Sequence, residues 1–148
     1  MGCSFSFESA IMDAKIPIRH IEDNHNVPMY ITNIPSEEVG IFHGNMVVSM
    51  RPIKYKDIVR TTTVTAMFPA THGSPIHIGY PKIIDIEDIY KPDFGERPEI
   101  REGEVPVFWP CGVTPQSVAL TSKPDIMIIH SPGHMLILDL VDSDVRVF

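Results

Sequence analysis

Residues 105–140 read VPVFWPCGVTPQSVALTSKPDIMIIHSPGHMLILDL, and this stretch decides the fold. Residues 105–110 form a short apolar and aromatic run, which is typical of a buried strand. Two further apolar runs lie at 126–130 and 135–140, and we expect each to be a strand. Glycine, proline and serine interrupt the sequence between the runs, so each run is expected to form one element.

A short helix is predicted between the first two strands. Thr114 is a candidate N-cap, and Pro115 suits the first helical position because proline has no N–H to leave unpaired. The helix would occupy 116–122, giving a βαβ unit over 105–130, and a turn at 131–133 would make a hairpin that ends at residue 140. We therefore expect an α/β fold of mixed α+β type, with a mixed sheet and short flanking helices.

Three chemically active side chains are predicted to meet at one edge of this unit. Cys111 follows the first strand, and His130 would end the second strand at the same edge if the two are parallel. His134 would return to that edge after the turn. Thiols and imidazoles can carry protons or act as nucleophiles, so these three are the candidate catalytic residues.

The start of the predicted helix is a candidate anion site. A helix N-terminus carries partial positive charge and unpaired backbone N–H groups, and a small carboxylate is the ligand that suits it. The alternative is an ordinary core in which these polar groups are satisfied internally. The candidate substrate-binding residues at this helix start are Gly112, Val113, Thr114 and Gln116.

Three residues elsewhere are further candidates for substrate binding. Arg51 is predicted at the end of a strand, where its guanidinium could grip a carboxylate. A surface ion pair is the alternative, and we favour it for Arg51. His72 and His77 lie in ATHGSPIHIG (70–79), a glycine-containing loop that could bring either ring to a ligand. A plain turn that leads into a strand is the alternative for both histidines.

Outside this stretch, one segment is ambiguous. Residues 61–65, TTTVT, are β-branched and favour a strand by propensity, but a strand from Pro52 would be too long, so a helix is preferred over 54–68. The other predicted elements are a helix at 7–15 capped by Ser6, an edge strand at 16–21, strands at 29–32, 45–50 and 76–78, a helical turn at 85–90 capped by Asp85, and a last strand or docked end at 141–148.

Length and charge restrict the class of protein. A chain of 148 residues with 43% hydrophobic and 21% charged residues predicts a single domain over 1–148. The net charge of −7 without a basic block argues against nucleic-acid binding. No apolar run is long enough to span a membrane. Cys3 and Cys111 are far apart, and the start lacks the features of a signal peptide, so we expect a cytoplasmic protein.

A metal site is considered and not favoured. His130 and His134 stand four residues apart, as zinc ligands on a helix often do. Pro132 and Gly133 predict a turn between them, so a helical arrangement of the two rings is not expected. We therefore predict no metal ligands and no cofactor.

Several segments together resemble one known family. They are GCSFSFE (2–8), RHIEDNHNVPMYITNIP (19–35), VVSMRPI (47–53), FPATHGSPIHIGYP (68–81), KPDFG (91–95), GEVPVFWPCGVTPQ (103–116) and HSPGHMLILDL (130–140). This order is similar to that of the hydro-lyase family, once a domain of unknown function, to which D-glutamate cyclase is related. The family motif residues that this chain matches are Cys111, Gly112, Thr114, Pro115, Gln116, His130, Pro132, Gly133, His134 and Asp139.

The resemblance implies an α/β fold and a lyase that eliminates water from a small carboxylic acid, with D-glutamate to 5-oxo-D-proline as one such reaction. Family members carry a substantial segment before GCSFSFE, so the chain resembles the C-terminal portion of the family domain. We therefore expect a homo-oligomer, or a partner chain that supplies the segment. Two alternatives stay open: a binding module that holds a small acid without converting it, and a structural subunit that needs a partner.

Overall fold

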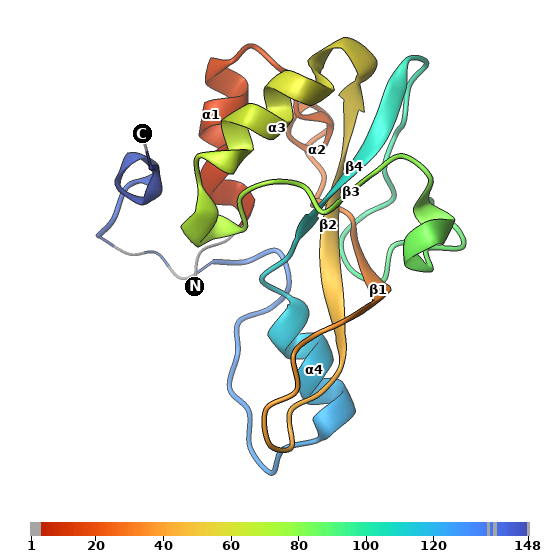
Figure 1. The fold of residues 1–148 in the computed structure, drawn as a ribbon, viewed down its shortest axis with the longest axis vertical. Coiled ribbons are helices and arrows are strands. Elements are labelled where there is room, and N and C mark those ends of the chain that lie inside the picture. Colours follow the sequence, from red (N-terminus) through yellow and green to blue (C-terminus); the bar gives the residue numbers. More distant parts are fainter. Residues whose placement is uncertain (1–3, 136, 138, 148) are drawn as a thin grey trace.

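The centre of the fold is a four-stranded antiparallel sheet with the strand order β1-β2-β4-β3 (Figure 1). The structure, a computed structural model, describes residues 4–135, 137 and 139–147. The strands are β1 (Met29–Pro35), β2 (Asn45–Lys54), β3 (His77–Ile78) and β4 (Glu104–Pro110). β2 is the longest strand, and it pairs with β1 on one side and with β4 on the other.

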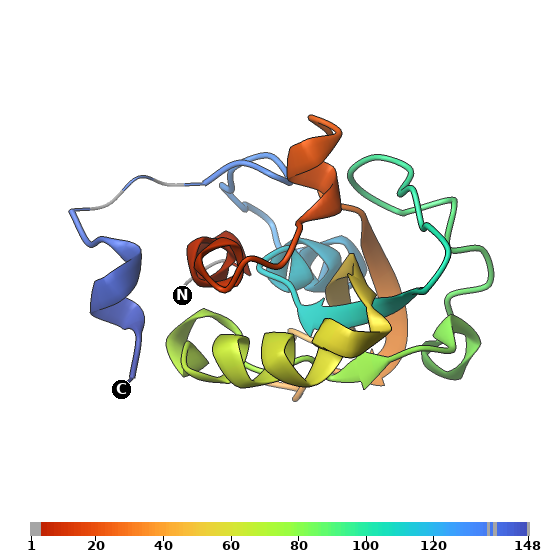
Figure 2. The same ribbon diagram turned by 90° about the horizontal axis from the view of Figure 1, so that it is seen from above.

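Helices cover one face of this sheet, as the view in Figure 2 shows. The α-helices are α1 (Glu8–Asp13), α2 (Arg19–Glu22), α3 (Ile58–Ala66) and α4 (Thr114–Ser122). Short 3-10 turns occupy Ser4–Phe7, Tyr55–Asp57, Pro69–Thr71, Pro81–Ile84 and Asp142–Val145. α1 packs against α3, and α4 packs against β2.

Alternation along β2 assigns its side chains to two different surroundings. Val47, Ser49 and Arg51 lie towards α1 and the start of α4, whereas Val48 and Met50 pack with Tyr30 and Phe108 in a second cluster. Both sets are buried, so β2 is covered on both faces. A strand that is buried on both faces has a largely apolar sequence, and for this reason VVSM at 47–50 predicts a strand.

The fold class is confirmed, and so are the central elements of the stretch at 105–140. A strand ends at Pro110, a helix follows from Thr114, and backbone N–H of His134 donates to Ser131 in the expected turn (3.1 Å). Helix at 54–68 is confirmed as Tyr55–Asp57 followed by α3. The strands at 29–32, 45–50 and 76–78 are confirmed with shifted ends.

The βαβ unit at 105–130 and the hairpin to 140 are wrong. Residues 126–130 form no strand, and neither do the described residues of 135–140; Leu136 and Leu138 lie outside the described residues. The sheet is also entirely antiparallel rather than mixed. The physical reason is that β4 already pairs with β2 on one edge and with β3 on the other, so no edge beside β4 is left for a parallel strand.

Three smaller predictions also differ from the structure. Residues 16–21 are not an edge strand, because Arg19 turns inward to bind Glu104 and begins the helix α2. The helix after Ser6 starts as a 3-10 turn at Ser4, and Ser6 does not cap it. A helical turn forms at Pro81–Ile84, before the predicted 85–90, since Pro81 is suited to a helix start.

The tail is docked, one of the two outcomes expected for 141–148. Val145 packs against the core beside α1 and α3, and the N–H of Val147 donates to the carbonyl of Met67 (2.8 Å). Figure 1 shows the blue segment after α4 running from the lower end of the molecule back towards α1. Phe148 lies outside the described residues.

Candidate functional site

A hollow of about 510 Å³ lies beside the start of α4. It is bounded by the 3-10 turn at 4–7, the loop at 111–113, and the segment from 130 to 145. Cys111, His130 and His134 all line it. The structure thus brings the three candidate catalytic residues to one hollow, although no parallel strand places the histidines there.

The Cys111 loop is held by direct bonds to β2. The N–H of Cys111 donates to the carbonyl of Val47 (2.9 Å), and the N–H of Val47 donates to Thr114 Oγ1 (3.0 Å). Thr114 Oγ1 in turn donates to the carbonyl of Cys111 (2.8 Å). The Thr114 hydroxyl therefore fixes the loop to the sheet, which positions the buried Cys111 at the wall of the hollow.

The helix start differs in detail from the expected anion site. Val113, rather than Thr114, is the N-cap residue. The N–H of Thr114 donates to Cys111 (3.1 Å) and that of Gln116 to Val113 (2.9 Å), so these amides stabilise the turn itself. Gly112 and Val113 are the predicted binding residues here that line the hollow. Any backbone contribution to ligand binding is therefore expected from residues 112 and 113.

Both histidines use the same ring nitrogen, Nδ1, to bond to a nearby backbone carbonyl. Nδ1 of His130 lies 3.0 Å from the carbonyl of Ser131, and Nδ1 of His134 lies 3.2 Å from that of Pro132. A carbonyl oxygen only accepts, so Nδ1 carries the hydrogen in each bond. In the neutral ring Nε2 is then the basic nitrogen, which suits proton transfer.

One side-chain hydrogen bond and one tightly packed glycine fix the histidine segment. Gln116 Nε2 donates to the carbonyl of His130 (2.9 Å), so this predicted binding residue supports the backbone of the site. Gly133 has a φ of +75°, and a Cβ there would lie 2.0 Å from Asn26 Nδ2. The turn before His134 consequently needs glycine and packs closely on the loop at 24–28.

Arg51 does not form a surface ion pair, and that prediction is wrong. Its side chain is fully buried, and its Nε and Nη2 donate to Glu8 Oε1, with Nε at 2.9 Å. The guanidinium also lies over the rings of Phe7 and Trp109, 5.1 and 5.5 Å from their centroids. Strand β2 continues to Lys54, so Arg51 is inside the strand rather than at its end.

The carboxylate partner of Arg51 is shared with a histidine. His20 Nε2 lies 3.2 Å from Glu8 Oε1. Burial alone would raise the pKa of Glu8, but the charges and hydrogen bonds of Arg51 and His20 outweigh burial and lower the pKa below its ordinary value. Glu8 is therefore a carboxylate at neutral pH and balances the buried guanidinium.

His72 and His77 take different places. His77 lies in β3, with its ring 5.7 Å from that of Phe108, which belongs to the cluster on the far face of the sheet. His72 follows Thr71, whose side chain lines the hollow. The structure therefore separates His77 from Cys111, and neither His72 nor His77 is among the residues that line the hollow.

Sequence reasoning missed the N-terminal wall of the hollow. Ser4, Phe5 and Ser6 line it, and so does Thr71. The segment GCSFSFE is one of the stretches that resemble the family, but the only role predicted within it is that of Ser6 as a helix cap. The long-range bond between Glu8 of α1 and Arg51 of β2 helps to bring this segment to the hollow.

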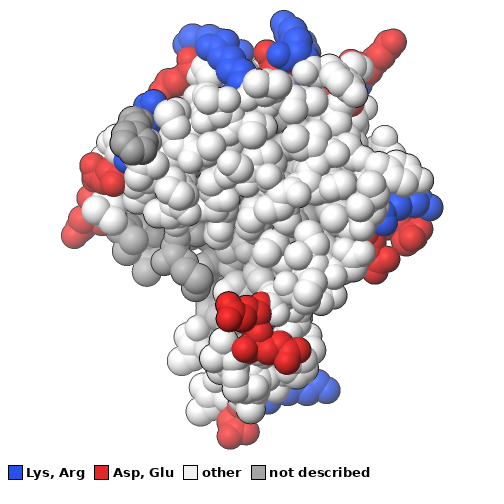
Figure 3. All heavy atoms as spheres, in the orientation of Figure 1, with Lys and Arg blue, Asp and Glu red and all other residues white. Residues whose placement is uncertain are grey.

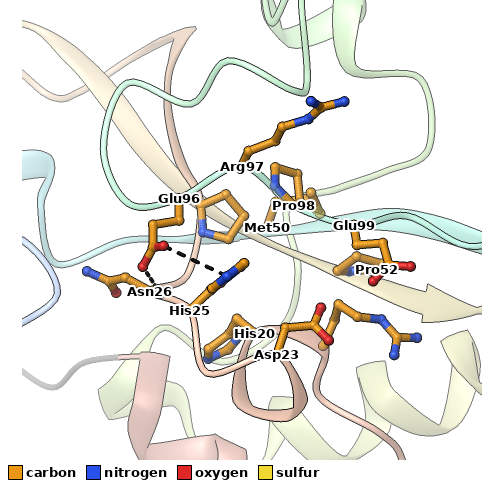
Figure 4. A pocket seen from close by; sticks show the side chains of 12 residues that line it. His20, Asp23, His25, Asn26, Met50, Pro52, Glu96, Arg97, Pro98 and Glu99 are labelled. Carbon is orange, nitrogen blue, oxygen red and sulfur yellow. Dashed lines mark hydrogen bonds and ion pairs between the residues drawn. The ribbon is translucent and has the colours of Figure 1, made fainter.

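A second pocket, shown in Figure 4, is too small for an organic ligand. It holds about 10 Å³, which is room for roughly one water molecule. In Figure 4 Glu96 faces both Asn26 and His25; its carboxylate accepts from the Asn26 N–H at 2.9 Å. The larger hollow is thus the candidate for a small-molecule site.

Figure 3 shows few Lys and Arg side chains on the face it displays, and they lie towards its edges.

Among residues 4–135, 137 and 139–147, no His, Cys, Asp and Glu side chains form a group of three or more that could hold a metal ion. In the described part of the chain, no helix combines the length and apolar character that crossing a membrane requires.

Comparisons with known proteins place this geometry in context. A family model described as D-glutamate cyclase matches residues 1–139. The chain is 65% identical over 147 residues to a protein of Psychrobacter arcticus named "Putative hydro-lyase", covering 99% of this chain and 56% of that one. Proteins with hydro-lyase names from Geobacillus kaustophilus and Clostridium beijerinckii are 63% and 62% identical, each again covered to 56%. The chain thus spans about half the length of the curated relatives it matches.

Proposed function

The chain belongs to the D-glutamate cyclase family, and from that premise we propose that its hollow takes part in eliminating water from a small carboxylic acid. D-glutamate, converted to 5-oxo-D-proline, is the substrate we propose. The observation that carries the proposal is that Cys111, His130 and His134 line one hollow of about 510 Å³. A volume of this order is typical of small-ligand sites.

The reaction closes a lactam ring. The ammonium group of the substrate loses one proton, and the neutral amine attacks the carbon of the side-chain carboxyl group. The C–N bond forms, the amine loses a second proton, and the C–O bond to one carboxyl oxygen breaks. That oxygen leaves as water after it receives protons. The site must therefore provide a base, a proton donor and dipoles that stabilise the oxyanion.

The residues of the hollow can fill these roles. Nε2 of His130 or His134 would take the proton from the ammonium group and return it to the leaving oxygen. Cys111 would be a second proton carrier, or a nucleophile that displaces the carboxyl oxygen as water to form a thioester, from which the amine then displaces the thiol as the ring closes. Its place before a helix N-terminus favours the thiolate. Backbone at Gly112 and Val113 would bind a carboxylate. We place this chemistry in the cytoplasm, where Cys111 would stay reduced.

The test is conversion of D-glutamate by the whole chain, followed by mass spectrometry as the loss of one water. We expect His134→Ala and Cys111→Ala each to lower turnover about 100-fold or more, the size of effect that loss of a general acid or base typically causes. His43→Ala is the matched control, because His43 is exposed and does not line the hollow. Full activity in both site variants would refute the scheme.

A specific observation favours a second candidate, a subunit that works only in an assembly. Ile126, Ile128 and Ile137 are 82%, 93% and 92% exposed, which is unusual for large apolar side chains so close together in sequence. We propose that a second copy or a partner chain covers them. Light scattering after size-exclusion chromatography tests self-association: we expect a dimer or larger, and Ile128→Ser shifting the protein towards monomer. A monomer that binds D-glutamate without converting it would favour the binding module instead.

A further inference from the structure

The Ser4 hydroxyl stands between a buried charge cluster and the hollow. Ser4 lines the hollow, yet only 1% of the residue is exposed. Arg51 Nη2 donates to Ser4 Oγ (3.2 Å), and Ser49 Oγ lies 3.3 Å away from it. Ser4 is therefore a buried polar residue that Arg51 and Ser49 hold by hydrogen bonds and that also lines the hollow.

The direction of the serine-to-serine bond follows from what surrounds Ser49. Arg51 Nη1 donates to Ser49 Oγ (3.1 Å), so the Ser49 hydroxyl already accepts. Ser49 is fully buried, and a buried hydroxyl hydrogen needs an acceptor. Within the described part of the chain, Ser4 Oγ is the acceptor recorded for it. Ser49 thus donates to Ser4.

The Ser4 oxygen consequently accepts two hydrogen bonds, one from Arg51 and one from Ser49. Both of its lone pairs are used, and its own hydrogen is left to donate. The remaining position at a tetrahedral oxygen lies away from these two partners, and Ser4 is also a lining residue of the hollow. A hydroxyl that accepts from a guanidinium is also polarised, which strengthens its own donation.

The cluster behind Ser4 holds this arrangement rigidly. The guanidinium of Arg51 is fixed by Glu8 and by the rings of Phe7 and Trp109, as described above. The pair is buried, so rotation of Arg51 would remove the guanidinium partner of the Glu8 carboxylate. A donor fixed in this way loses little entropy when it binds a ligand.

We propose that the Ser4 hydroxyl donates a hydrogen bond to a carboxylate oxygen of the substrate in the hollow, an inference that rests on the function proposed above. Ser4 is then a binding residue that contacts the substrate, and Arg51 behind it is a positioning residue. Cys111 and Ser4 belong to different segments of the lining, the 111–113 loop and the 4–7 turn.

The test measures the Kd of the whole chain for D-glutamate and for glutarate by calorimetry. Glutarate has both carboxylates but no amine, so it can bind and cannot be cyclised. We expect Ser4→Ala to weaken both ligands by about 10- to 100-fold, as a hydrogen bond to a charged group would. Urea unfolding of each variant confirms that the fold is intact.

The matched control is Ser49→Ala, which breaks the same cluster from the side away from the hollow. It leaves the bond from Arg51 Nη2 that holds the Ser4 hydroxyl, so we expect less than about a threefold change in Kd. Equal losses in the two variants would mean that the cluster acts only through the fold, and unchanged binding in Ser4→Ala would also overturn the proposal. Binding of both ligands without conversion of D-glutamate would refute the proposed reaction alone. Failure of the wild type to bind either acid would refute both.

Discussion

Two apolar stretches of this chain differ in both burial and secondary structure. Residues 47–50, VVSM, are fully buried in β2, whereas residues 126–129, IMII, are exposed and form no strand. Both runs are apolar and of similar length. β2 has β1 and β4 as neighbours, while the second run has no strand beside it. An apolar run therefore becomes a strand only where the sheet offers it an edge.

The two regions also differ in how their polar groups are satisfied. In the body formed by residues 4–123, buried Arg51, Glu8, Ser49 and Ser4 bond to one another. In the segment at 124–147, the rings of His130 and His134 bond only to nearby backbone in the interactions recorded for the described residues. The hollow lies where these regions meet, so one wall is rigid and the other is held at separate points.

The largest effect that would test this contrast is expected for Arg51→Met. It leaves the buried Glu8 carboxylate without its cation, which should lower the free energy of unfolding by about 3–5 kcal/mol. Arg101→Met is the matched control, because Arg101 pairs with Glu99 at the exposed surface, and it should change stability by less than about 1 kcal/mol. Urea unfolding measures both. Similar values would mean that the buried cluster is not structural.

The next effect compares the same substitution in both regions. Ile53→Ala removes a side chain that is 1% exposed and should cost about 2–5 kcal/mol, because it leaves a cavity in the core. Ile128→Ala should stay within about 0.5 kcal/mol for the chain alone. Thermal or urea unfolding at low protein concentration provides the measurement. A large loss in Ile128→Ala would show that the segment is covered in solution.

A smaller effect is expected at the joint between the regions. Thr114→Val removes the hydroxyl that accepts from the buried N–H of Val47 and should cost about 1–3 kcal/mol. Thr121→Val is the control, since Thr121 bonds only to the preceding helical turn in the recorded contacts and should stay within about 0.5 kcal/mol. If Thr114 bound the substrate directly, ligand affinity would fall while stability stayed unchanged.

The smallest expected effect is on the response to acid. The folded pKa of Glu8 is lowered from an ordinary value of 4.5, so its stabilising contribution is present above that pH and is lost as pH falls through the lowered pKa. Glu8→Gln should be less stable at neutral pH and should lose less further stability on acidification than the wild type. Urea unfolding between neutral pH and about pH 3 tests this. Parallel curves for the two proteins would contradict it.

The sequence predicted the local elements better than their partners. The β4 strand, helix α4 and the turn before His134 follow from apolar runs, proline and glycine, which act over a few residues. The partner of each strand is a long-range property, and for this reason the expected parallel strand at 126–130 was wrong. The buried state of Arg51 was missed for the same reason, because Glu8 is distant in the sequence.

Cys111, His130 and His134 line one hollow as predicted, but the contacts that bring them there differ from those expected. The prediction relied on parallel strands that end at one edge. In the structure, Gln116 holds the carbonyl of His130, and the tail beyond His134 returns to the core. Ser4 could not be identified as part of the lining from local patterns, since its position depends on α1 packing over β2.

The docking of Val147 on Met67 has a consequence for how the reacting groups are spaced. Gln116 holds His130 and Met67 holds Val147, so the segment 130–147, which carries both histidines, is attached to the body at both ends. The distance between His134 and Cys111 then depends on the number of residues between these two contacts. Closing a somewhat longer loop carries only a small entropic penalty. A change in the number of residues between these two attachment points would therefore move His134 relative to Cys111 without altering the sheet.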